Sequence, residues 1–105
     1  MEHETVVTLA DQGKTLPGQV VSKTLVQNNA VSITLFEFDK DEEISTNDST
    51  GDAMVTVLEG TGRLTVDGKV YIVGADETLI MPAKQPHAVY AQEAFKMLLV
   101  VVFPQ

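Results

Sequence analysis

Short runs of alternating apolar and polar residues dominate the chain, and glycine, proline, asparagine or aspartate bounds most of them. Val31–Phe38 ("VSITLFEF") alternates with Val31, Ile33 and Leu35 on one face, as a half-buried strand does. Met54–Gly60 ("MVTVLEG") alternates in the same way. No segment keeps a helical period over three turns. The pattern therefore predicts an all-β chain folded as a sandwich or small barrel.

Other stretches complete this prediction. Asp67-Gly68, between "RLTV" and "KVYIV", can supply the two positive φ angles of a type I′ turn and is the strongest hairpin signal. Phe95–Phe103 is apolar apart from Lys96 and runs without interruption from Met97, so both of its faces should be covered. The polar stretch Ser45–Asp52 predicts a loop, where binding residues often lie. Further strands are expected at Val6–Ala10, Gln19–Gln27, Glu77–Pro82 and His87–Ala91.

The composition limits the function classes. With 105 residues and 44% hydrophobic residues, the chain has the size and apolar content of one folded domain. Its formal net charge of −8 argues against nucleic acid and anionic membranes as partners, because both repel an acidic protein. The absence of cysteine excludes disulfides, Cys-zinc sites and thiol nucleophiles. The acidic segment at Met1–Gly13 does not resemble a signal peptide, so we expect a cytoplasmic protein.

His87 lies in a segment with a recognisable pattern, "DETLIMPAKQPHAVYA". Together with "VLEG" and "VDG" before it, this segment resembles the second motif of the cupin superfamily, G-x5-P-x-G-x2-H-x3-N. The resemblance covers Val31–Phe103, and Pro82 and His87 fall on motif positions. It implies a double-stranded β-helix, or jelly-roll barrel. Asp76, Lys84 and Ala91 stand where the motif has its two glycines and its asparagine.

The first cupin motif, G-x5-H-x-H-x3-4-E-x6-G, ends here at Gly60 and has lost its metal ligands. Ala53 stands at the glutamate position. The two histidine positions fall on Asn47 and Ser49 with the shorter spacing, or on Thr46 and Asp48 with the longer one. In metal-binding cupins the two histidines and the glutamate of this first motif, together with the histidine of the second motif, hold one ion. Since zinc and iron sites need three or four suitable ligands, we expect no tightly bound metal and no cofactor. His87, Asn47 and Asp48 remain weak candidates for a divalent ion.

We therefore expect the barrel to bind a small, mostly apolar molecule in its interior, beside His87. Strand alternation from the motif positions turns small and aliphatic side chains inward. Two alternatives stay open: a metal-dependent cupin enzyme of dioxygenase or isomerase type with a degenerate site, and a filled barrel that serves as an interaction domain. The loss of three of four ligand positions argues against an enzyme. The predicted ligand-binding residues are His87, Asn47, Ser49, Ala53, Val55, Val89 and Ala91.

The resemblance and the strand pattern together divide the chain into two regions. Residues 31–105 should form the barrel, and residues 1–30 should add strands that pack on the barrel or form a dimer interface. Val6–Ala10 and Gln19–Gln27 supply more β-forming sequence than one small barrel needs. An open strand edge beside apolar residues is commonly covered in a homodimer. We therefore expect a homodimer, as is common among similar cupins.

Overall fold

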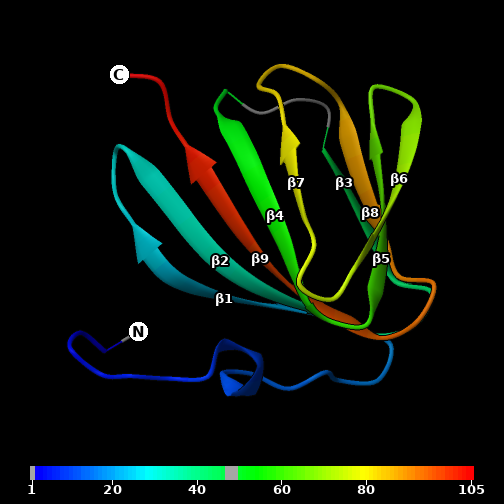
Figure 1. Ribbon diagram of the computed structural model, residues 1–105, viewed down its shortest axis with the longest axis horizontal. Coiled ribbons are helices and arrows are strands. Elements are labelled where there is room, and N and C mark those ends of the chain that lie inside the picture. Colours follow the sequence, from blue (N-terminus) through cyan, green and yellow to red (C-terminus); the bar gives the residue numbers. More distant parts are fainter. Residues whose placement is uncertain (1, 47–49) are drawn as a thin grey trace.

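Two antiparallel sheets face each other in this protein (Figure 1). A computed structural model describes residues 2–46 and 50–105. The five-stranded sheet has the order β1-β2-β9-β4-β7 and the four-stranded sheet the order β3-β8-β5-β6, so the predicted all-β jelly roll is confirmed. The elements are η1 (Leu9–Asp11), β1 (Val20–Gln27), β2 (Val31–Phe38), β3 (Glu43–Thr46), β4 (Asp52–Glu59), β5 (Thr61–Val66), β6 (Lys69–Gly74), β7 (Thr78–Met81), β8 (His87–Tyr90) and β9 (Phe95–Val102).

The core lies between the two sheets. The rings of Phe38 and Phe95 stack there with their centroids 4.7 Å apart and their planes 12° from parallel. Gly62 leaves room for this stack, because a Cβ at Gly62 would come within 2.7 Å of the Phe95 ring. The inward alternation predicted for β4 is confirmed, since Val55 and Val57 are fully buried in the core cluster.

The β5–β6 hairpin closes with the two-residue turn that the sequence predicts. Asp67 has φ 48° and Gly68 has φ 81°, and Val66 pairs with Lys69. This register turns Val70 and Ile72 to the outer face of β6, where both are exposed. The turn prediction is thus confirmed.

One predicted strand does not form. In Val6–Ala10 the chain is irregular up to η1, which begins at Leu9. No strand in the described part of the chain pairs with this segment, and an isolated strand cannot satisfy its backbone hydrogen bonds. Despite its β-forming composition, the segment therefore pairs with no strand in residues 2–46 and 50–105.

One strand was missed, and the predicted polar loop is shorter than expected. Ser45 and Thr46 belong to β3, and Asp52 begins β4. β3 is only four residues long and has little hydrophobic pattern. It is a strand because it pairs with β8, and not because of its own composition. Asn47, Asp48 and Ser49 lie outside the described residues.

Candidate functional site

The segment before His87 is held in place by the backbone. Lys84 has φ 63°, and Asp76 has φ 67° at the start of the same motif. These are the two positions at which the cupin motif carries glycine, so the left-handed backbone is kept although the glycines are lost. The N–H of Asp67 donates to the carbonyl of Pro86 at 2.8 Å, and the N–H of Ala83 donates to Oδ1 of Asp52 at 2.8 Å. The loop is thereby tied to both sheets.

His87 is the first residue of β8 and pairs with Thr46 of β3 and Val66 of β5. Its Nδ1–H donates to the carbonyl of Gln85, 3.2 Å away. A backbone carbonyl can only accept, so this bond fixes the ring orientation and places the proton on Nδ1. The imidazole is half-buried between the two sheets.

A cavity of about 110 Å³ lies beside the ring. Both sheets contribute to its wall: β2, β7 and β9 from the five-stranded sheet, and β3 and β8 from the four-stranded sheet. Of the described residues that line it, His87 is the only titratable one, and most of the others are aliphatic, aromatic or thioether side chains. The full lining is Phe36, Ile44, Ser45, Met81, His87, Val89, Met97 and Leu99.

The structure separates the predicted binding residues into three groups. His87 and Val89 line the cavity. Ala53, Val55 and Ala91 point inward and are buried in the core, but they are not part of the cavity wall. Asn47 and Ser49 lie outside the described residues.

Sequence reasoning missed most of the wall. Phe36 and Leu99 reach it from β2 and β9, which pair in register between Phe36 and Met97. In β2 the alternation groups Val31, Ile33 and Leu35 on one face but does not say which face turns inward, and β9 is apolar on both faces from Met97 onward. Ile44 comes from the unrecognised strand β3. The signal that could have found Phe36 is its spacing of two residues from Phe38, which puts both rings on one face.

The described residues do not form a metal centre of the family's kind. Within residues 2–46 and 50–105, no three His, Cys, Asp or Glu side chains come together. Ala53, at the family's glutamate position, presents a methyl group to the core. One imidazole and one methyl at two of the four ligand positions are not a donor set for zinc or iron.

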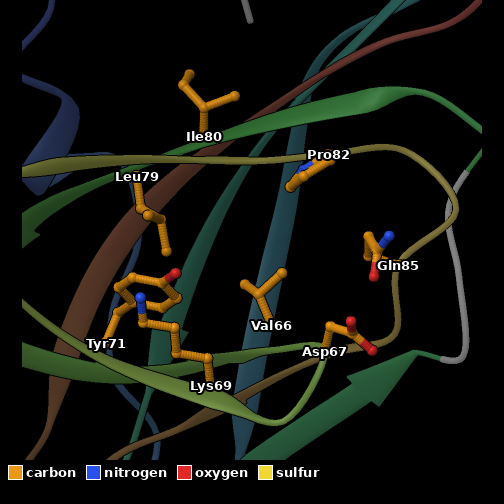
Figure 2. Close-up of a pocket in the computed structure, with 8 residues that line it drawn as sticks. All are labelled: Val66, Asp67, Lys69, Tyr71, Leu79, Ile80, Pro82 and Gln85. Atoms are coloured by element: carbon orange, nitrogen blue, oxygen red, sulfur yellow. The ribbon is translucent and has the colours of Figure 1, made fainter.

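A second hollow, a groove of about 440 Å³, opens between β7 and the β5–β6 hairpin (Figure 2). Leu79, Val66 and Tyr71 form its apolar part, and the Lys69 ammonium lies 5.3 Å from the centre of the Tyr71 ring. Asp67 and Gln85 stand at its polar end. The groove is larger than the interior cavity but open to solvent, so a ligand there would remain largely hydrated.

An ionic cluster lies on the opposite side of the five-stranded sheet. Glu37 is 1% exposed, and neither of its carboxylate oxygens has a hydrogen-bond partner among the described residues. Lys96 Nζ is 4.0 Å from Glu37 Oε1 and 3.3 Å from Glu59 Oε2, and it donates to the carbonyl of Ala10 at 2.6 Å. Burial raises the pKa of Glu37, the Lys96 ammonium opposes this, and the Glu59 carboxylate adds to it. The cluster is closed off from the cavity by the sheet itself.

In the described ranges, no helix has the length and apolar character needed to cross a membrane.

Known proteins resemble the chain over its whole length. It is 47% identical to a conserved protein of unknown function from Streptococcus pyogenes, covering 100% of this chain and 92% of that one with a TM-score of 0.95. A cupin superfamily protein from Desulfitobacterium hafniense is 29% identical over 99% of this chain and 95% of that one, with a TM-score of 0.92.

A third similar structure is longer. A cupin 2 conserved barrel domain protein from Leptotrichia buccalis is 42% identical, with a TM-score of 0.86, over 89% of this chain but only 45% of that one. No curated protein matches the sequence. The family model described as "Cupin domain" matches residues 34–103, which is more than half of the chain. The chain therefore belongs to the cupin family.

Proposed function

We propose that this cupin is a cytoplasmic binding protein that holds a compact, mostly apolar molecule in the cavity beside His87, without a tightly bound metal. The observation that carries this proposal is the cavity itself, about 110 Å³ in volume and lined by apolar side chains together with the His87 imidazole and Ser45. Close-packed interiors leave few voids larger than a water molecule. An apolar cavity of roughly 150 Å³ is known to stay dry and to take up benzene.

The wall also sets the chemistry of the ligand. Met81 and Met97 are flexible thioethers that can adapt to a ligand's outline, and Phe36 offers a ring face. Binding energy would come from removing apolar surface from water, at about 25 cal/mol per Å². His87 would orient the ligand through a polar substituent, because its ring is held by the bond to Gln85.

Binding can be tested by titrating isotope-labelled protein with benzene, phenol or cyclohexanol and recording its NMR spectra. We expect saturable shifts at Val89, Leu99 and His87, and a raised melting temperature with the probe that fits best. Val89→Ile narrows the cavity and should weaken this binding at least fivefold. Val73→Ile is the matched control, because Val73 is an equally buried core valine that does not line the cavity.

Two outcomes would contradict the proposal. If none of the three probes binds saturably, the interior is a filled barrel and the interaction-domain alternative gains. If untagged protein keeps stoichiometric zinc, iron, nickel or manganese after dialysis, the metal-free reading is wrong. The cupin-enzyme alternative would then be favoured.

A further inference from the structure

Two edge strands border the groove between β6 and β7. β6 ends the four-stranded sheet and β7 ends the five-stranded sheet, so each of them pairs with a described strand on one side only. A second hollow of about 200 Å³ continues the groove toward the turn that joins β6 to β7, and Tyr71 and Leu79 line both hollows. We call this continuous groove the seam. It follows β7 over its length, from Thr78 to Pro82.

The backbone of β7 directs two residues' hydrogen-bonding groups into the seam. The N–H of Val57 in β4 donates to the carbonyl of Glu77 at 3.1 Å. Hydrogen-bonded pairs recur at every second residue of an antiparallel ladder, so Leu79 also bonds to β4. The N–H and C=O groups of Thr78 and Ile80 therefore point away from β4, to the edge where no described strand pairs with them.

β6 presents free backbone groups from the other side of the seam. The two-residue turn after Val66 makes the first pair of the hairpin a hydrogen-bonded one, so every second residue of β6 from its first bonds to β5. The N–H and C=O groups of Val70 and Ile72 therefore face the seam. The next residue of this set, Gly74, confirms the phase, because its N–H donates to Glu77 Oε1 at 2.7 Å and not to β5.

The edge of β7 lacks the features that commonly prevent strand addition, which are charged residues, prolines and bulges. Thr78–Met81 contains no charged residue and no proline, and its pairing with β4 is regular. Exposed apolar side chains lie on both sides of the seam. Ile80 of β7 is 59% exposed, and Ile72 and Val70 of β6 are 55% and 50% exposed. A segment added at this edge would cover apolar surface as well as satisfy backbone groups.

From this we infer that the seam binds an extended peptide segment of another protein, which adds to β7 as an antiparallel strand. Its backbone would bond to Thr78 and Ile80, whose free groups repeat roughly every 7 Å, as those of a peptide strand do. Figure 2 shows Leu79 pointing into the groove toward Tyr71 and Ile80 pointing away from it. Alternate side chains of the peptide would lie beside these two sets. The inference does not depend on what the interior cavity binds.

Charge favours a basic peptide as the occupant. The formal net charge of −8 attracts a cationic partner. Asp76 and Glu77 are adjacent acids at the turn end of the seam, and neither forms an ion pair with another described residue. At the other end, the Lys69 ammonium lies over the Tyr71 ring, 5.3 Å from its centre. Since β7 runs away from the turn, an antiparallel peptide runs toward it. The peptide should therefore be apolar at alternate positions and carry Lys or Arg at its C-terminal end.

The test uses the amidated peptide Thr-Val-Thr-Val-Thr-Lys-Lys with a fluorescent label at its N-terminus. Fluorescence anisotropy should show saturable binding to the wild-type protein. Ile80→Pro should weaken this binding about tenfold, because it removes one N–H that faces the seam and leaves the bonds to β4 in place. Ile80→Val is the matched control, since it keeps the N–H and a β-branched side chain, and it should bind within about twofold of wild type. A peptide that ends in Glu-Glu should bind at least fivefold more weakly.

Hydrogen exchange followed by NMR reads the same edge without a substitution. The peptide should slow exchange of the Thr78 and Ile80 amides about tenfold and leave the amide of Leu99, which lines the interior cavity, unchanged. No saturable binding at 100 µM peptide would overturn the inference, and so would equal binding of the Glu-Glu peptide. Protection of the Thr78 and Ile80 amides in the free protein that dilution removes would also overturn it, because a second copy of the chain would then occupy the seam.

Discussion

The two faces of the five-stranded sheet are both rich in apolar side chains, but they are covered by different things. The inner face packs against the second sheet, where Phe38, Phe95 and Met97 are buried almost completely. The outer face meets the N-terminal segment at its Glu37 end, whereas Ile80 and Val102 farther along this face stay exposed. The difference shows that the apolar content of a sheet face does not by itself tell how far that face is buried. Contacts with distant segments of the chain decide this.

Polar groups also differ between the two faces. The inner cavity is lined by one imidazole, and its Nδ1–H is satisfied by a backbone carbonyl. The outer face holds the buried Glu37 carboxylate, which accepts no hydrogen bond from the part of the chain that the structure describes and shares the Lys96 ammonium with Glu59. The inner face is therefore stabilised by packing, and the covered end of the outer face depends on ionic balance.

The largest expected effect is on the inner face. Phe95→Ala removes a stacked, buried ring and should lower the free energy of unfolding by about 4 kcal/mol. Val21→Ala, on the covered end of the outer face beside Glu37, should cost only about 1 kcal/mol. Urea unfolding measures both. If Phe95→Ala does not fold, Phe95→Leu gives a smaller loss of the same sign, and equal losses for Val21→Ala and Phe95→Leu would contradict the comparison.

The next effect concerns the counter-ion on the outer face. Lys96→Met leaves the buried Glu37 carboxylate without its cation and should cost about 3 kcal/mol at pH 8. The cost should shrink as the pH is lowered toward 5, because burial raises the pKa of Glu37 and the loss of the Lys96 ammonium removes the charge that opposes this rise. Urea unfolding at the two pH values tests this, with Lys23→Met as a lysine control that is also on the outer face. A cost independent of pH would mean that Lys96 acts through packing alone.

Removing the carboxylate charge should show the opposite trend. Burial raises the pKa of Glu37 in the folded state, so its stabilising contribution is present at acidic pH and is lost as pH rises through that pKa. Glu37→Gln abolishes this loss and should be about 1 kcal/mol more stable than wild type at pH 8. Near pH 4 the two proteins should differ little. Parallel stability curves between pH 4 and pH 8 would show that Glu37 does not titrate in this range.

The smallest effects come from backbone positions that belong to neither face of the sheet. Gly68→Ala should lower stability by about 1 kcal/mol, because φ at Gly68 is 81° and a Cβ there meets no favourable contact. Lys84→Gly is the reverse exchange at φ 63° and should raise stability by about 0.5 kcal/mol. Thermal unfolding resolves both signs. An unchanged melting temperature for Gly68→Ala would remove the claim that the turn requires glycine.

Much of the fold could be predicted from local patterns in the sequence. The alternation in Val31–Phe38 gave β2 at its observed bounds, and Asp67-Gly68 gave the two-residue hairpin. The motif around His87 located the start of β8 and indicated the cupin family. These features could be predicted because each depends on a few neighbouring residues, through strand periodicity or a required positive φ.

The remaining features were set by contacts between residues far apart in the chain. Val6–Ala10 has β-forming composition but no partner strand in the described ranges, whereas β3 has little hydrophobic pattern but pairs with β8. The cavity wall combines side chains from β2, β3, β7, β8 and β9, so no single segment could reveal it. The sequence by itself determined the all-β class, most strands of the barrel and the position of the motif histidine at the start of β8. Only the tertiary structure decided which apolar face became the core and which stayed open, because burial depends on what packs against a strand and not on the strand's own residues.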